Sequence, residues 1–253
     1  MDEVFVDTDE RLDVVVGTDL RLIQKIDGTA FAIDTLLLAQ FVRPGGQVGR
    51  VADLGSGSGI LAFLLKYRQP ALEIVGFEVQ EEFHQLALRN LQLNRQMAGL
   101  SFELLDVREI PARILPESFD LVVANPPYYP LGTGRLPERP GRAQARHELT
   151  GTLRDFVEAA AWLLPYGSRL AMVVPSNRFY ELADLLKPAP FGVKRLQFVH
   201  PKEGQPSHLA LVEAERFYNG PHQALPALTI HRADGGFTPE LEHLFQVGLR
   251  PKP

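Results

Sequence analysis

Two kinds of hydrophobic pattern alternate along the chain. Short apolar runs bounded by glycine or polar residues are typical of buried strands, whereas apolar residues spaced three and four positions apart predict helices. Strands are predicted in this way at residues 50–54, 73–79, 101–107, 119–124 and 168–174, and helices at residues 60–67, 81–97 and 153–164. Strands that alternate with helices of this length predict a doubly wound, largely parallel sheet.

Two further apolar runs, at residues 193–200 and 208–215, bring the predicted sheet to seven strands. Only the segment PKEGQPS separates these two runs. Because a helical crossover needs a longer connection, we expect an antiparallel hairpin at an edge of the sheet. The expected fold class is therefore α/β, a Rossmann-like, seven-stranded, mostly parallel sheet with an antiparallel C-terminal edge hairpin.

The remaining residues flank this sheet. Residues 20–24 alternate enough to predict a short strand, and Asp34 can cap a helix that runs through TLLLAQFV. The tail contains a strand-like run, TIHRA, and a helix-like run, PELEHLFQV. We expect an N-terminal segment of residues 1–45 packed on the core, a main domain of residues 46–220, and a C-terminal extension of the same domain at residues 221–253.

The composition excludes several classes of protein. The 253 residues contain no cysteine, which rules out disulfides, thiolate zinc sites and a cysteine nucleophile. The N-terminus is acidic and unlike a signal peptide, and no apolar run reaches the length of a membrane helix, so we expect a cytoplasmic protein without a membrane partner. The net charge is −5, but it divides into −8 over residues 1–128 and +3 over residues 129–253. A locally basic surface in the second half is compatible with a nucleic-acid partner.

A glycine-rich turn follows the first predicted strand of the sheet. Its sequence is Asp53-Leu-Gly55-Ser-Gly57-Ser-Gly59, and it precedes a predicted helix. Glycines at these positions let the backbone turn sharply and approach a ligand closely. Ile60 stands where the dinucleotide fingerprint requires glycine, and the Gly-Lys-Ser/Thr ending of a phosphate loop is missing. A turn that only joins strand to helix is the alternative.

A second motif, Asn125-Pro126-Pro127-Tyr128, follows the fourth of these strands. Ligands of open α/β sheets bind beyond the carboxyl ends of the strands, so both motifs are expected at the same edge. The prolines stiffen the backbone and hold the Asn125 side-chain oxygen and the Pro126 carbonyl as two fixed acceptors. Such a pair suits a planar –NH2 group, and Tyr128 offers a ring on which its planar carrier can stack. A structural Pro-Pro turn with a packed tyrosine is the alternative.

Together the motifs resemble those of class I S-adenosylmethionine-dependent methyltransferases that modify amino nitrogens. Four segments are similar more specifically to the bacterial tRNA(Val) adenine-N6 methyltransferase family. These segments are residues 24–41, NPPYYP, Ala145-Arg-His-Glu148 and HPKEGQPSHLALVEAER. The similarity spans roughly residues 20–235, although the acidic N-terminus has no counterpart that we can match.

The resemblance implies a set of site residues. It implies that S-adenosyl-L-methionine is the cofactor, that Glu78 accepts hydrogen bonds from its ribose, and that Asp106 accepts one from its adenine. The complete implied cofactor set is Phe31, Asp53, Gly55, Gly57, Glu78, Asp106, Val107 and Asn125. Asn125 to Tyr128 are implied to bind the target amino group. The expected substrate is N6 of an adenine in RNA, with a tRNA as the expected molecule.

A basic loop follows the second motif. Four arginines fall within twelve positions, at Arg135, Arg139, Arg142 and Arg146. Because arginine binds phosphate in a bidentate manner, this loop is a candidate for holding the RNA backbone, with a solvated loop as the alternative. His200 and His208 flank the predicted hairpin turn, but no third ligand lies at metal spacing, so we expect surface histidines and no metal site.

Two other functions remain open. A protein glutamine methyltransferase that acts on a release factor would also bind a planar –NH2 group. Such enzymes carry a helical domain ahead of the glycine loop, whereas only 52 residues precede Asp53 here. A non-catalytic RNA-binding or cofactor-sensing module is expected to lose the acceptors of the NPPY motif, which this chain retains. The sequence carries no signal for an oligomeric state.

Overall fold

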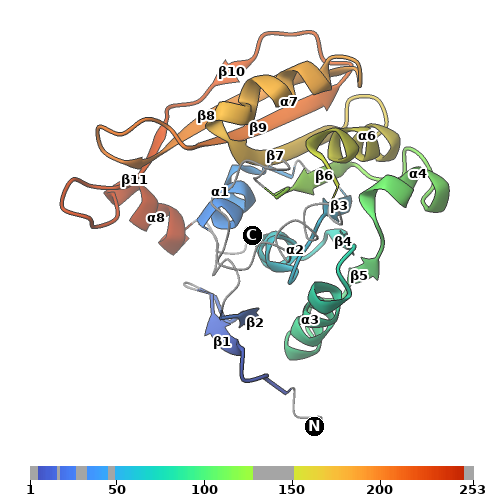
Figure 1. Ribbon diagram of the computed structural model, residues 1–253, viewed down its shortest axis with the longest axis vertical. Coiled ribbons are helices and arrows are strands. Elements are labelled where there is room, and N and C mark those ends of the chain that lie inside the picture. The colour runs from blue at the N-terminus through green and yellow to red at the C-terminus, as the bar shows by residue number, and fades with distance from the viewer. Residues whose placement is uncertain (1–4, 16–17, 27–32, 45–48, 128–150, 248–253) are drawn as a thin grey trace, which may run out of the picture.

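A nine-stranded sheet forms the centre of the molecule. The computed structural model describes residues 5–15, 18–26, 33–44, 49–127 and 151–247. The strand order is β10-β8-β9-β7-β6-β3-β4-β5, and β11 also pairs with β8 (Figure 1). Its strands are β3 Arg50–Leu54, β4 Glu73–Glu78, β5 Leu100–Leu104, β6 Leu121–Ala124, β7 Arg169–Pro175, β8 Phe191–Lys202, β9 Leu209–Arg216, β10 Gln223–Ala224 and β11 Leu228–His231. Neighbouring strands from β5 to β7 are parallel, and β9 runs antiparallel to β7 and β8.

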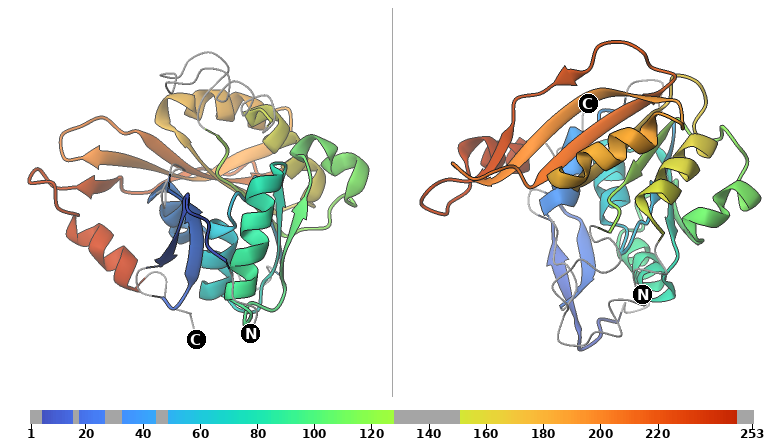
Figure 2. Two further views of the ribbon diagram at one scale, coloured as in Figure 1. Left: turned by 60° about the horizontal axis from the view of Figure 1, so that its bottom comes forward. Right: turned by 45° about the horizontal axis from the view of Figure 1, so that its top comes forward.

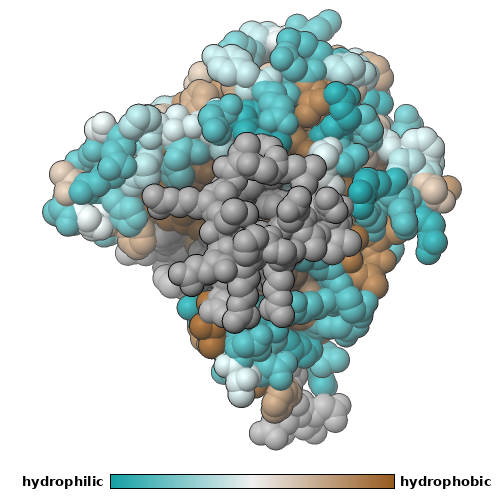
Figure 3. Space-filling view, viewed as in Figure 1, coloured by the Kyte–Doolittle hydropathy of each residue, from teal (hydrophilic) through white to brown (hydrophobic). Residues whose placement is uncertain are grey.

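Helices cover both faces of this sheet (Figure 2). They are α1 Ile33–Phe41, α2 Ile60–Arg68, α3 Glu81–Leu93, α4 Ile110–Arg113, α6 Leu153–Leu163, α7 Phe179–Leu186 and α8 Pro239–Val247, with 3-10 turns η1 Val107–Glu109 and η2 Ser176–Arg178. Two apolar cores result, one beneath α1 and α2 and the other beneath α6 and α7. Hydrophilic residues predominate over the described surface seen in Figure 3. Among the described residues, no helix combines the length and apolarity that a membrane crossing requires.

The predicted α/β sheet and its antiparallel hairpin are confirmed, and the structure adds two strands outside the hairpin. β9 lies between β7 and β8, so the seven predicted strands form one continuous run from β5 to β8. β10 and β11 pair in parallel with the far side of β8, which is therefore not the outermost strand. The twelve residues of β8 would otherwise leave a long row of backbone groups unpaired. The strand-like run in the tail supplies β11.

A two-stranded hairpin precedes the sheet. β1 Glu10–Val14, which the hydrophobic pattern did not predict, pairs antiparallel with β2 Arg21–Lys25. Asn90 of α3 holds this hairpin, because its amide accepts from the Ile23 N–H at 2.6 Å and donates to the Ile23 carbonyl at 3.1 Å. The same Asn90 side chain donates to the Ser58 carbonyl at 3.0 Å. One buried asparagine thus ties the hairpin to the glycine-rich turn.

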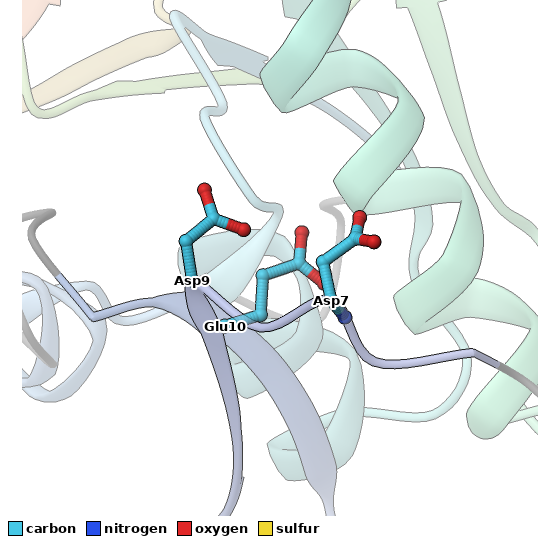
Figure 4. A group of neighbouring side chains, drawn as sticks. All are labelled: Asp7, Asp9 and Glu10. Carbon is cyan, nitrogen blue, oxygen red and sulfur yellow. The ribbon is translucent and has the colours of Figure 1, made fainter.

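The acidic N-terminus has a structural role in the hairpin. Asp7, Asp9 and Glu10 gather at the start of β1 and have the spacing of a potential cation site (Figure 4). The Glu10 carboxylate is instead paired with Arg89 at 2.5 Å and Lys25 at 3.3 Å. Burial alone would raise the pKa of Glu10, but hydrogen bonds from Arg89, the Asp7 backbone and Lys25 lower that pKa to about 2. The cluster therefore neutralises cations of α3 and β2.

Candidate active site

A pocket of about 260 Å³ opens at the carboxyl ends of β3, β4 and β6. This strand-end pocket is the position at which open α/β sheets bind ligands. Loops after those three strands supply most of its polar groups, and the N-terminal hairpin and α1 close one side. The lining residues are Gln24, Lys25, Thr35, Asp53, Gly55, Ser56, Gly57, Ser58, Ile60, Leu61, Phe77, Glu78, Val79, Gln80, Phe83, Leu86, Leu105, Val107, Asn125, Pro127 and Phe156.

The glycine-rich turn forms the floor of the pocket. Gly57 and Gly59 have φ values of 56° and 88°, in the left-handed region that favours glycine. A Cβ atom on Gly57 would meet no atom within 4 Å, so the backbone there is open to a ligand. A Cβ atom on Gly59 would lie 2.6 Å from the Phe102 ring. One glycine therefore exposes the backbone, and the other permits close packing beneath it.

Glu78 connects the end of β4 to this turn. Its side chain accepts from the Gly57 N–H at 2.8 Å and from the Gln80 N–H at 2.8 Å. Glu78 is only 4% exposed, and burial raises the pKa of its carboxyl despite the hydrogen bonds from Gln80 and Gly57. Each carboxylate oxygen keeps further acceptor capacity toward the pocket. The arrangement suits a ligand with paired hydroxyl donors, such as a ribose.

Asp53, at the other side of the turn, is an incompletely satisfied buried carboxyl. It is 1% exposed, and its Oδ2 atom has no hydrogen-bond partner in the described part of the chain. The pKa of Asp53 is raised to about 8, mainly by burial. The hydrogen bond from the Ala62 N–H acts against this rise, and the charge of Glu78 adds to it. A cationic ligand group such as an ammonium would supply the missing partner. The hydrogen-bond acceptors of the pocket therefore fit S-adenosyl-L-methionine, which carries both ribose hydroxyls and an ammonium.

Asn125 follows β6 directly and lines the same pocket. Its Nδ2 atom donates to the Thr35 hydroxyl of α1 at 2.9 Å. Pro126 is buried and Pro127 is exposed at the pocket wall. The structure thus brings the first three residues of the NPPY motif beside the predicted cofactor residues. Tyr128 lies outside the described residues and stays a prediction.

Asp106 does not lie in the pocket wall, although its neighbour Val107 does. β5 ends at Leu104, three residues before the predicted end at Val107. The Asp106 carboxylate accepts from the Arg108 backbone N–H at 2.9 Å and pairs with the Arg108 guanidinium at 2.5 Å. Capping η1 therefore draws Asp106 into a short turn instead of the strand. Its contact with a ligand adenine stays a prediction that requires the carboxylate to be shared with Arg108.

Other predicted residues lie outside the described part of the chain. These are Phe31 and the loop arginines Arg135, Arg139, Arg142 and Arg146. Conversely, the pocket contains residues that the sequence analysis did not single out, among them Lys25, Thr35, Gln80 and Phe156. Gln80 could have been found from its position two residues after Glu78. Phe156 comes from α6, far along the chain, and carries no local signal.

The fold is similar to that of solved structures described as methyltransferases. A solved structure of a predicted O-methyltransferase from Agrobacterium tumefaciens superposes with a TM-score of 0.69 at 22% identity, covering 87% of this chain and 98% of that one. A Rossmann-like sheet with a strand-end pocket suited to this cofactor defines an S-adenosyl-L-methionine-dependent methyltransferase. The chain belongs to the methyltransferase small domain family, whose model matches residues 27–195.

Similar proteins are named for a particular RNA modification. A tRNA1(Val) (adenine(37)-N6)-methyltransferase from Proteus mirabilis is 27% identical over 196 residues, which are 76% of each chain. A protein of the same name from Yersinia pseudotuberculosis is 26% identical over 208 residues, covering 82% of this chain and 80% of that protein.

Proposed function

We propose that this protein transfers the methyl group of S-adenosyl-L-methionine to the exocyclic N6 atom of an adenine in RNA, with tRNA as the substrate class. The observation that carries the proposal is the position of Asn125, which lines the same pocket as Gly57 and Glu78. The names of the Proteus and Yersinia proteins favour an adenine of a tRNA as the target. A cytoplasmic setting fits an enzyme that acts on tRNA.

Three residues of the pocket are proposed to hold the cofactor. Glu78 would accept from the ribose hydroxyls, Asp53 would pair with the ammonium, and Gly57 would let the backbone come close. When bound, S-adenosyl-L-methionine supplies an electrophilic methyl group on a sulfonium, with a neutral thioether as the leaving group. The protein must then orient a weak nucleophile toward that methyl group, a contribution that can be worth several kcal/mol.

The NPPY motif is proposed to act on the target amino group. The nitrogen of an aromatic –NH2 is a poor nucleophile because its lone pair is delocalised into the ring. Acceptors for both hydrogens, the Asn125 side-chain oxygen and the Pro126 carbonyl, would favour the pyramidal form with a localised lone pair. Tyr128 would stack on the base, a contact typically worth about 1–3 kcal/mol. The four loop arginines would bind the RNA backbone.

A protein glutamine methyltransferase is the second candidate, because its target is also a planar amide nitrogen. The described residues ahead of the glycine-rich turn form the β1–β2 hairpin and α1. Within the described residues, no helical bundle of the kind expected of release-factor methyltransferases lies ahead of the turn. A non-catalytic module is disfavoured because the Asn125 acceptor is retained within the pocket.

Methyl transfer from labelled S-adenosyl-L-methionine tests the proposal directly. The acceptors are total RNA and total protein, and the RNA product is digested to nucleosides. We expect label in RNA as N6-methyladenosine. An Asn125→Ala variant should lower the single-turnover rate about 100-fold, since an aimed hydrogen-bonding group contributes at this scale, and should lower cofactor affinity far less. Label found only in protein glutamine would overturn the RNA assignment, and transfer to neither fraction would overturn the enzymatic function.

A further inference from the structure

The first turn of α1 contacts the side chain of Asn125. The Asn125 Nδ2 atom donates to the Thr35 hydroxyl at 2.9 Å, although the two residues are 90 positions apart. The Asn125 amide also donates to the Asp34 carboxyl; burial raises the pKa of this carboxyl, and the hydrogen bond from Asn125 acts against that rise. Asp34 itself is held by the Thr35 backbone N–H at 2.9 Å. Two neighbouring residues of one helical turn therefore both accept from the nitrogen end of Asn125.

These contacts determine which end of the carboxamide faces the pocket. An amide group has nearly the same shape after a 180° rotation, so packing alone does not distinguish its oxygen from its nitrogen. Nδ2 carries two hydrogens, and the Thr35 hydroxyl oxygen or a carboxylate oxygen of Asp34 can accept them. A hydroxyl could also donate to Oδ1, but a carboxylate could not. With Asp34 beside Thr35, the nitrogen end of the amide is therefore held on the α1 side and Oδ1 is turned away from α1.

The orientation matters because the two ends of the amide have opposite effects on a target –NH2 group. Oδ1 accepts a hydrogen from the target nitrogen, whereas Nδ2 would present its own hydrogens to that nitrogen. In the described part of the chain, the hydrogen bond from the Asn125 side chain to Thr35 uses Nδ2. Thr35 and Asn125 both line the strand-end pocket, so the contact lies at the proposed reaction site.

We propose that Thr35, with Asp34 beside it, is a positioning residue that holds the Asn125 carboxamide with its oxygen toward the target amino group. The inference rests on the proposed function, because it assumes that Asn125 accepts from the methylated nitrogen. Thr35 acts through Asn125 and needs no contact of its own with the target. Its hydroxyl is the acting group, and its methyl group only fills space.

Two substitutions at Thr35 separate the hydroxyl from the shape of the side chain. Thr35→Val keeps the shape and removes the acceptor, and Thr35→Ser keeps the hydroxyl and removes the methyl group. We expect Thr35→Val to lower the single-turnover rate constant about tenfold, the loss that one such hydrogen bond supports. Cofactor and RNA dissociation constants should change by less than about twofold, and Thr35→Ser should keep at least about half of the wild-type rate. Thermal denaturation of each variant checks that the fold is retained.

A second pair of variants tests whether Thr35 acts through Asn125. A carboxylate has two equivalent oxygens, so in an Asn125→Asp background the orientation of residue 125 no longer matters. Adding Thr35→Val to Asn125→Asp should therefore cost less than about twofold in rate. A tenfold loss in both backgrounds would overturn the inference, because Thr35 would then act independently of Asn125.

The remaining outcomes separate this inference from the proposed function. If Asn125→Ala lowers the rate but Thr35→Val does not, the positioning role alone is overturned. Equal losses in Thr35→Val and Thr35→Ser would also overturn it, since the hydroxyl would not be the cause. If Asn125→Ala itself leaves the rate unchanged, the acceptor mechanism fails and the positioning role fails with it. Every rate is measured on the same acceptor, which is the fraction, RNA or protein, that the wild-type enzyme labels.

Discussion

The Glu78 carboxylate accepts a hydrogen bond from the backbone N–H of Gly57 at 2.8 Å. This bond joins the end of β4 to the glycine-rich turn after β3, so the proposed ribose acceptor and the floor of the pocket are held as one unit. A change at Glu78 should therefore affect both ligand binding and the position of the turn.

Replacing Glu78 with alanine should weaken S-adenosyl-L-methionine binding by about 1.5–3 kcal/mol, the range for hydrogen bonds to charged groups. Calorimetric titration of the folded variant measures this loss. Glu73→Ala is the matched control, because Glu73 is an exposed glutamate at the opposite end of the same strand, β4. Wild-type affinity in Glu78→Ala would place the ribose elsewhere.

Asp53 should make the stability of the ligand-free protein depend on pH. Its pKa is about 8 in the folded protein against 3.8 as an ordinary aspartate, so the folded state keeps a proton that the unfolded state has lost. The stability that this provides is complete below about pH 4 and is lost as the pH rises through about 8. Relative to wild type, Asp53→Asn should therefore gain free energy of unfolding between pH 5.5 and 8, by more than about 1 kcal/mol.

Urea denaturation of both proteins at the two pH values measures this difference. The same Asp53→Asn change should weaken cofactor binding, because an amide cannot pair with an ammonium as a carboxylate does. Parallel pH dependence in wild type and variant would show that Asp53 is not the titrating group.

Alanine at Gly59 should destabilise the protein far more than alanine at Gly57. Both positions have positive φ, a conformation that costs a non-glycine residue about 1–2 kcal/mol. Only at Gly59 would the new Cβ also collide with packed rings, at 2.6 Å from Phe102 and 2.9 Å from Phe63. We expect a loss of about 1 kcal/mol for Gly57→Ala and at least about 3 kcal/mol for Gly59→Ala by chemical denaturation. Equal losses would mean that the rings move away without cost.

Asn90→Ala should destabilise the attachment of the N-terminal hairpin. The substitution leaves the buried N–H and carbonyl of Ile23 without partners and removes the bond to Ser58. We expect a loss of about 2–4 kcal/mol and faster amide exchange over β2. Gln92→Ala, at an exposed position of the same helix, is the control and should be nearly neutral. Unchanged exchange in β2 would show that packing alone holds the hairpin.

The double variant Arg142→Ala, Arg146→Ala should weaken RNA binding and reduce its salt slope by roughly 1 for each phosphate group that the variant no longer binds. This prediction comes from the sequence, since both arginines lie outside the described residues. Cofactor binding should be retained. Lys187→Ala, at an exposed cation directly after α7, should leave the slope as in wild type. Identical RNA binding by the double variant across a salt series would remove the loop from the interface.

The sequence predicted the parts of the site that depend on local signals. The glycine-rich turn and Asn125 each follow a strand, Glu78 is the last residue of one, and the topology of a parallel sheet brings such positions together. Thr35 was missed because its role depends on a contact across 90 positions of the chain. Asp106 was placed at a strand end because SFELLDV is apolar enough to be a strand, whereas its bond to the Arg108 N–H starts a 3-10 turn.

The elements that escaped prediction are short or polar. In β1, charged residues outnumber apolar ones, and only Glu10 is buried, because two cations surround its carboxylate. α7 has eight residues, and a sequence of that length carries too few turns for its spacing to be decisive. Both elements exist because tertiary partners stabilise them, which a single local pattern does not record.

The two short strands beside β8 also bear on how copies of this protein behave toward one another. Backbone pairing by β10 and β11, together with the bond from the Leu225 N–H to the Leu196 carbonyl at 2.8 Å, covers the outer row of β8 between Arg195 and Lys202. An unprotected row of that length is a template on which a strand from another chain can add. By pairing with β8, β10 and β11 therefore reduce the tendency to aggregate. Removing them should first cause strand pairing between molecules at high protein concentration.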